Sequence, residues 1–315
     1  MAIATNQQIT HYYDSYSDKE VIFSREIMHT LRIVPREIYI KCGGSQWPCI
    51  INSTSFKAAK IILGRAGGAF ALITQKNAPP VNLRFCFFID KGTETMSFFI
   101  AGKVTGVAQY ADSKELAVVT LTYTQRPPDD FIVKIGALIE ADINFVRRKE
   151  DRIVMTSETR YRLGIEKEDT IVYVQNVPRK CILRDLSFSG AKVVLFGVPK
   201  FVSGKEAVLR INFDDPVETV DIRGTIVAAV FAEGRQDIVT ASIKFDEQSV
   251  PAAYKLHIND YLTMTKNNLL DVSAQVQRTQ PRTVEQAAAA MKARLNAAAQ
   301  RGTSVQNISN AMAGK

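Results

Sequence analysis

One segment of this chain occurs twice without a gap, and this repeat constrains the fold more than any other feature. Residues 49–63 read CIINSTSFKAAKIIL and residues 181–195 read CILRDLSFSGAKVVL, so Cys, Ile, Ser, Phe, Ala, Lys and Leu recur at the same places. Strand periodicity explains the shared apolar positions, but it does not require the SF and AK pairs. We therefore expect two related domains with the same local fold.

Strand-like stretches surround both copies of the repeat. Residues 37–123 and 153–245 each contain short runs of β-branched and aromatic residues separated by Gly, Asn, Asp and Pro, a pattern typical of antiparallel β-structure. A helical pattern follows each series, at residues 131–141 and again at 251–266, because apolar residues recur there at helical spacing. The sequence predicts two β-domains, each followed by a helix.

The C-terminal segment 271–315 has a different composition, poor in large apolar side chains. Thr283 and Gln286 form a capping-box signature, and the Ala-rich run to Arg301 has high helix propensity before Gly302 ends it. Because its apolar face is too small to bury much surface, we expect a frayed tail helix and not a third domain. A partner-docking role for this helix is left open.

Composition and charge exclude several classes of protein. A hydrophobic content of 46% in 315 residues is that of a folded chain with room for two domains. The net charge of +8 favours anionic partners such as nucleic acid, nucleotides or anionic lipid. A soluble protein that is basic without binding such a partner is the alternative. The four cysteines lack C-x-x-C spacing and are expected to be buried thiols, not zinc ligands. The chain start has no signal-peptide pattern and no apolar run reaches ~18 residues, so we expect a cytoplasmic protein without membrane insertion.

Two short motifs carry the clearest indication of chemistry. Arg148 and Arg152 form R-x-x-x-R, and residues 185–190, DLSFSG, form D-x-S-x-x-G. R-x-x-x-R alone is weak, because the chain contains it again at residues 32–36 and 278–282. Only the middle pair precedes D-x-S-x-x-G by the length of a strand hairpin, so the conjunction is the signal.

These residue types suit a guanine dinucleotide. A guanidinium presents a planar fork that fits phosphate oxygens or the O6 and N7 edge of guanine, and its flat face stacks on a purine. Asp185 can accept hydrogen bonds from guanine N1 and N2, Ser187 can bond a phosphate or sugar oxygen, and Gly190 permits close backbone approach or positive φ. The alternative is structural: DLSFSG is a hairpin turn in which Asp185 bonds its own backbone, while Arg148 pairs with a neighbouring carboxylate.

With both motifs in place, residues 146–264 resemble a PilZ domain, whose hallmarks are R-x-x-x-R in the entry segment and [D/N]-x-S-x-x-G on a six-stranded β-barrel. Residues 13–144 resemble the N-terminal PilZ-like domain of the two-domain, spirochaete-type members of that family. The resemblance implies a mainly β fold of two related six-stranded antiparallel β-barrels, each followed by a helix, plus the Ala-rich tail helix. The expected divisions are a first domain at 1–140, a linker at 141–152, a second domain at 153–270 and a tail at 271–315.

The resemblance also implies a function. PilZ domains are receptors for the bacterial second messenger cyclic di-GMP, so we expect a non-enzymatic effector without a cofactor, with motility regulation among its outputs. Its expected ligand-binding residues are Arg147, Arg148, Arg152, Asp185, Ser187 and Gly190. Arg147 adds the second basic residue that accompanies a bound ligand pair in the family, although a spare arginine in a linker is equally expected.

The first domain is expected not to bind, because Ser53 and Ala58 occupy the places of Asp185 and Gly190. Ligand binding should pin the linker, change the domain arrangement and signal to a downstream protein or nucleic acid. The alternative function is a nucleic-acid-binding double β-barrel, possible if Phe87, Phe98 and Phe99 are exposed for base stacking.

Overall fold

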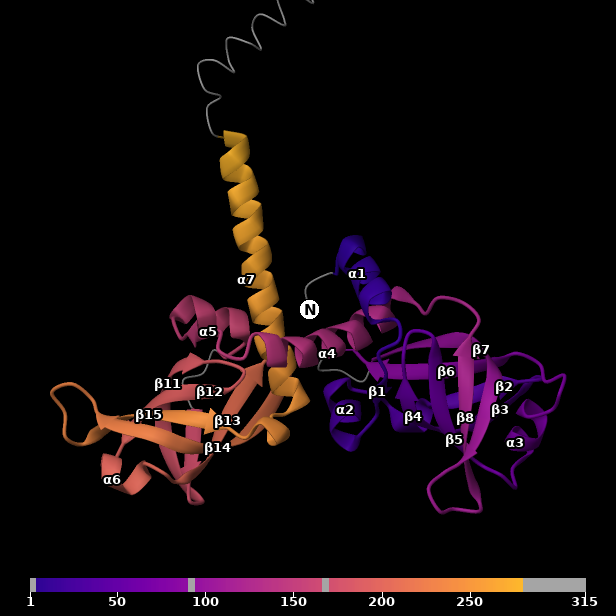
Figure 1. The fold of residues 1–315 in the computed structure, drawn as a ribbon, viewed down its shortest axis with the longest axis horizontal. Coiled ribbons are helices and arrows are strands. Elements are labelled where there is room, and N and C mark those ends of the chain that lie inside the picture. Colours follow the sequence, from indigo (N-terminus) through magenta and orange to yellow (C-terminus); the bar gives the residue numbers. More distant parts are fainter. Residues whose placement is uncertain (1–3, 90–93, 166–169, 280–315) are drawn as a thin grey trace, which may run out of the picture. The chain divides into compact units, whose positions relative to one another are not determined.

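The protein is described by a computed structural model that covers residues 4–89, 94–165 and 170–279, and its elements form two β-units that follow each other along the chain (Figure 1). The first β-unit contains α1 (Asn6–Tyr16), β1 (Val21–Ile22), α2 (Arg25–Thr30), the 3₁₀ turn η1 (Pro35–Glu37), β2 (Tyr39–Cys42), β3 (Ser45–Pro48), β4 (Ile50–Thr54), β5 (Ala58–Gly64), α3 (Gly68–Ile73), β6 (Val81–Phe88), β7 (Thr95–Gln109), β8 (Leu116–Tyr123) and α4 (Asp129–Arg147).

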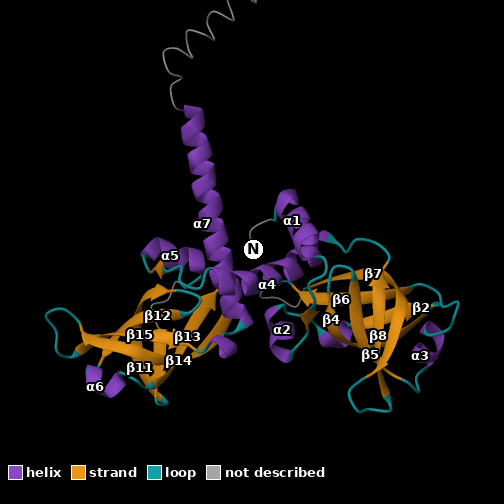
Figure 2. Ribbon diagram, in the orientation of Figure 1, coloured by secondary structure: helices purple, strands orange, loops and turns teal. Residues whose placement is uncertain are grey.

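The second β-unit repeats this order of strands followed by a helix. It contains β9 (Ile153–Val154), α5 (Ser157–Leu163), β10 (Thr170–Val174), β11 (Val177–Leu186), β12 (Gly190–Phe196), α6 (Pro199–Val202), β13 (Glu206–Asp214), β14 (Val217–Phe231), β15 (Ile238–Phe245), the 3₁₀ turn η2 (Glu247–Ser249) and α7 (Ala252–Thr279). Figure 2 shows that strands dominate both units. The predicted mainly β fold, with a helix after each strand series, is confirmed. The tail residues Thr283 to Gly302 lie outside the described residues.

The second sheet closes into a barrel. Its strands follow the order β10-β13-β14-β15-β12-β11, and a further antiparallel pairing between β10 and β11 joins the two ends. The short strand β9 adds to β11 beside the end of the barrel. Alternate residues of each strand point inward, so Leu209, Ile211 and Ile222 are fully buried. The predicted six-stranded antiparallel barrel is confirmed here.

The first sheet has eight strands in the order β1-β4-β5-β8-β7-β6-β2-β3. Its extra strands have a local cause, because β3 and β4 are separated only by Cys49. β3 pairs with β2 as the first half of β11 pairs with β10, and β4 pairs with β5 as the second half of β11 pairs with β12. With β3 and β4 taken as one interrupted strand, and β1 as the equivalent of β9, the six-stranded pattern recurs.

The internal repeat is confirmed in the strand register. Residues 49–63 and 181–195 form equivalent hairpins, β4–β5 and β11–β12, whose paired positions match one to one. Both hairpins even share a register shift at the same place, across Asn52 in β4 and across Arg184 in β11. Such a shift bends the strand and re-aims the next side chain. The residues at 53 and 185 therefore occupy equivalent positions in the two hairpins.

In each β-unit, the long helix that follows the strands buries apolar side chains in the core. In α4, the predicted face of Phe131, Ile135, Leu138 and Ile139 is buried within the first core, as its helical spacing requires. In α7, Tyr254 and Ile258 are fully buried in the second core. No helix within the described part of the chain is long and apolar enough to cross a bilayer.

Candidate functional site

The pairing of β9 with β11 brings the second arginine of R-x-x-x-R to the acidic residue of the turn motif. Arg152 directly precedes β9, and Val154 of β9 lies opposite Asp185 of β11. Arg152 Nη1 donates a hydrogen bond to Asp185 Oδ1 at 2.6 Å. Residues 33 positions apart in the chain thus form one charged cluster.

A third charged residue, which sequence reasoning missed, completes this cluster. Lys192 of β12 lies directly opposite Asp185 in the hairpin register, and its Nζ is 3.8 Å from Asp185 Oδ2. The Asp185 side chain is 12% exposed, whereas the Arg152 and Lys192 side chains are 45% and 44% exposed. Two half-exposed cations therefore flank one nearly buried carboxylate, so the cluster presents a net positive charge to solvent.

The first arginine of the motif is placed differently. Arg148 is the C-cap of α4, and its Nε donates to Asp151 Oδ2 at 2.8 Å. This is the pairing that the structural alternative predicted for Arg148. Arg147 is exposed in the last turn of α4. The seven residues 141–147 of the expected linker are therefore helical, and the irregular part is 148–152.

Ser187 shapes the turn and is not exposed to solvent. Its side chain is fully buried, its Oγ accepts a hydrogen bond from the Gly190 amide at 3.1 Å, and its own amide donates to the Gly190 carbonyl at 2.8 Å. The Tyr254 hydroxyl donates to the Ser187 carbonyl at 2.7 Å, and burial, followed by the nearby Asp185, raises the pKa of Tyr254 well above its ordinary value. Ser187 therefore holds the turn against α7. The more accessible hydroxyl belongs to Ser189, which contacts Glu150 at 3.3 Å.

Gly190 is required for close backbone approach and not for positive φ. Its φ is not among the positive values found in the described residues. A Cβ at this position would lie 2.4 Å from the carbonyl oxygen of Ile243 in β15, far inside van der Waals contact. The φ angle therefore shows that the positive-φ interpretation of Gly190 is wrong. The glycine is needed because a side chain here would prevent the close pairing of β12 with β15.

The first β-unit carries the opposite charge at the position of the arginine. There, Glu20 precedes β1 as Arg152 precedes β9, Ser53 stands at the place of Asp185, and Lys60 stands at the place of Lys192. Lys60 Nζ binds the Glu20 carboxylate at 2.8 Å, and the Ser53 hydroxyl also donates to it. These bonds, from Lys60 first and then Ser53, lower the pKa of Glu20. Extending the repeat backward from residue 49 would have aligned Glu20 with Arg152.

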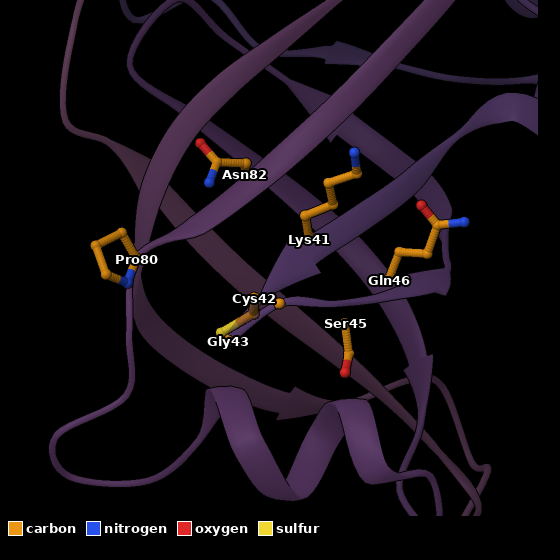
Figure 3. A pocket seen from close by; sticks show the side chains of 8 residues that line it. Lys41, Cys42, Gly43, Ser45, Gln46, Pro80 and Asn82 are labelled. Carbon is orange, nitrogen blue, oxygen red and sulfur yellow. The ribbon is translucent and has the colours of Figure 1, made fainter.

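Other features of the described chain do not offer an alternative site. A pocket in the first β-unit, about 370 Å³ in volume, is lined by residues 41–46 with Pro80 and Asn82 (Figure 3). Its one cation, Lys41, is held over the ring of Phe99 at 4.8 Å. No group of three or more His, Cys, Asp and Glu residues that could hold a metal is found in the part of the chain that the structure describes.

The aromatic residues considered for nucleic-acid stacking are mostly core residues. Phe87 is fully buried and Phe98 packs against the first core, whereas Phe99 is 38% exposed. The aromatic set therefore offers one accessible ring instead of a stacking platform.

All four cysteines are buried free thiols, as predicted from their spacing.

The fold and the motif geometry define a member of the PilZ family, and comparison with known proteins shows that the chain belongs to it. Residues 146–264 match the PilZ domain, and residues 7–142 match the PilZN3 domain. A relative from Treponema denticola is 41% identical over 272 residues, covering 86% of each chain, and is described as a "Cyclic di-GMP binding protein".

Two solved structures are similar at lower identity. The PlzA protein of Borreliella burgdorferi, in complex with c-di-GMP, is 21% identical, covers 81% of this chain and 98% of its own, and has a TM-score of 0.36. YcgR of Escherichia coli, also in complex with c-di-GMP, is 12% identical over 84% of this chain and 99% of its own, with a TM-score of 0.27.

Proposed function

We propose that this protein is a non-enzymatic receptor for cyclic di-GMP, bound at the second β-unit by Arg148, Arg152 and Asp185. The observation that carries the proposal is the cluster of Arg152, Asp185 and Lys192, with its excess of positive charge next to a fixed carboxylate acceptor. The Treponema denticola relative, described as a cyclic di-GMP binding protein, supports the same ligand. The first β-unit has a charge-balanced cluster at the equivalent place, which does not suit a dianion.

Binding replaces internal ion pairs by ligand contacts. Asp185 accepts hydrogen bonds from the N1 and N2 groups of one guanine, which frees Arg152 from its present pairing. Arg148 exchanges Asp151 for a phosphate or a guanine edge in the same way. The two phosphates of the ligand then supply the negative charge that the arginines lose with their carboxylate partners.

The other motif residues have supporting parts in this proposal. Ser187 orders the turn and Gly190 lets β12 pair closely with β15, so both position Asp185 and the backbone of the turn. Arg147 is exposed at the end of α4 and can reach a second ligand molecule, so one ligand or an intercalated pair are both compatible with this part of the site.

Helix α4 offers a route by which the ligand changes the arrangement of the two β-units. Phe145 of α4 packs edge-on against Phe188 of the turn motif, with ring centroids 6.0 Å apart. Asn144 Nδ2 donates to Asn259 Oδ1 of α7 at 2.7 Å. A ligand that pins residues 148–152 therefore acts on the end of a helix whose other turns belong to the first core.

Calorimetric titration of the full chain with cyclic di-GMP tests the proposal. Arg148→Ala and Arg152→Ala should each weaken binding at least tenfold, because a hydrogen bond to a charged group contributes about 1.5–3 kcal/mol. Arg235→Ala is the matched control, since Arg235 pairs with Asp237 in an exposed ion pair of the same β-unit. The proposal is wrong if the parent does not bind, or if the two motif variants bind as the control does.

A further inference from the structure

Lys192 belongs to the same charged cluster as the motif residues Arg152 and Asp185, although it is part of neither motif. It faces Asp185 across the β11–β12 hairpin, and its side chain is 44% exposed. Its Nζ lies 3.8 Å from Asp185 Oδ2, whereas Arg152 Nη1 lies 2.6 Å from Asp185 Oδ1. The two cations therefore flank opposite oxygens of one carboxylate.

The first β-unit shows what a lysine at this position does when its charge is balanced. Lys60, the equivalent of Lys192, has its own carboxylate in Glu20, with N–O distances of 2.8 and 3.0 Å. In the second β-unit the residue equivalent to Glu20 is a cation, Arg152, so Lys192 shares the single carboxylate of Asp185 at a longer distance. The chain thus contains two equivalent lysines, Lys60 in a neutral cluster and Lys192 in a cluster with an excess positive charge.

We propose that Lys192 is a third cationic ligand-binding residue, which contacts a phosphate of the bound dinucleotide. The inference rests on the proposed function and extends it beyond the two motifs. When guanine takes over the carboxylate of Asp185, Lys192 and Arg152 lose their shared partner together. An ammonium on a flexible four-carbon stem then binds a phosphate oxygen as a point charge, beside the planar fork of the arginine.

The experiment compares Lys192→Met, Lys192→Arg and a control, Lys200→Met, in the full chain by titration with cyclic di-GMP. Lys200 is an exposed lysine of α6 in the same β-unit. We expect Lys192→Met to bind about tenfold more weakly than the parent, as the loss of one charge-assisted hydrogen bond implies. Lys192→Arg should recover most of the affinity, Lys200→Met should bind like the parent, and the deficit of Lys192→Met should shrink as salt rises.

Comparing two ligands separates a direct phosphate contact from an effect transmitted through Asp185. Cyclic di-GMP and cyclic di-AMP share their phosphates, so loss of a phosphate contact in Lys192→Met should weaken both by a similar factor in competition titrations. A loss confined to cyclic di-GMP would act through the guanine acceptor Asp185, would make Lys192 a positioning residue and would overturn the inference. Unchanged affinity in Lys192→Met would overturn it as well, provided that the parent binds. A parent that does not bind cyclic di-GMP would instead refute the proposed function, so the two failures are distinguishable.

Discussion

The two charged clusters of this chain permit a test in which one is converted into the other. The double substitution Arg152→Glu with Asp185→Ser reproduces, around Lys192, the residue types of the Glu20, Ser53 and Lys60 cluster. Because that cluster exists at the equivalent strand positions, the double variant should fold. It should also lose binding of cyclic di-GMP, since an anion replaces the arginine and the guanine acceptor is gone.

The two single substitutions should cost more stability than the double one. The Arg152–Asp185 pair is intermediate in burial, with side chains 45% and 12% exposed. Exposed pairs contribute about 0.2–1 kcal/mol and breaking a buried pair costs about 3–5 kcal/mol, so we expect each single substitution to destabilise the second β-unit by about 1–2 kcal/mol. Arg152→Glu also places two carboxylates together. The double variant should lose less than about 1 kcal/mol of unfolding free energy. The two substitutions are then coupled by at least about 1 kcal/mol, because their separate losses add up to more than the loss in the double variant.

Native-state hydrogen exchange resolves this effect by region. Opening free energies of peptides from residues 177–196 report the second β-unit, and those from residues 45–64 report the first as an internal reference. The single tryptophan, Trp47, lies in β3, so its fluorescence during urea unfolding gives a second reading of the first β-unit. Additive losses in the double variant, with no rescue, would refute the equivalence of the two clusters.

Three further outcomes are expected. Asp185→Asn should bind cyclic di-GMP with a modest loss, whereas Asp185→Ala should lose affinity more strongly and discriminate less against cyclic di-AMP in competition titrations, because unpaired guanine donors cost about 1–3 kcal/mol. Gly190→Ala should destabilise the second β-unit by about 1–3 kcal/mol in urea unfolding, because its Cβ would lie 2.4 Å from the carbonyl oxygen of Ile243; an unchanged midpoint contradicts this reading. Burial raises the pKa values of Cys49 and Cys181 to about 12, so their thiolate fraction at pH 8 is small and rises about tenfold per pH unit. Iodoacetamide should therefore label these two thiols only after unfolding. Rapid labelling of the folded chain would contradict this expectation.

Patterns in the sequence predicted those parts of the site that depend on local structure. The gapless repeat located two equivalent hairpins, since a shared residue order at shared strand positions imposes the same register. The apolar spacing of α4 predicted its buried face for the same reason. The two motifs together indicated one shared site but not its contacts, and the ion pair at 2.6 Å between Arg152 and Asp185 is what the structure adds.

The remaining features depend on contacts that local patterns do not encode. Lys192 was missed because its role depends on cross-strand register. The recurring AK pair marked it as part of the repeat, but that pattern does not show which charged residues face the lysine. The charge inversion at Glu20 was missed because the strand that follows it has only two residues, too few to show a repeat. The reason for Gly190 lies in β15, more than fifty residues along the chain, where the Ile243 carbonyl excludes a Cβ.

The central claim is most directly tested by measuring which dinucleotide the full chain binds. Isothermal titration of the parent protein with cyclic di-GMP, cyclic di-AMP and GTP, in one buffer at one ionic strength, separates guanine recognition from general attraction of anions to a chain with a net charge of +8. We expect saturable binding of cyclic di-GMP that is at least tenfold tighter than the binding of the other two ligands. Equal affinities for all three, or no heat with cyclic di-GMP from a folded sample, would contradict it.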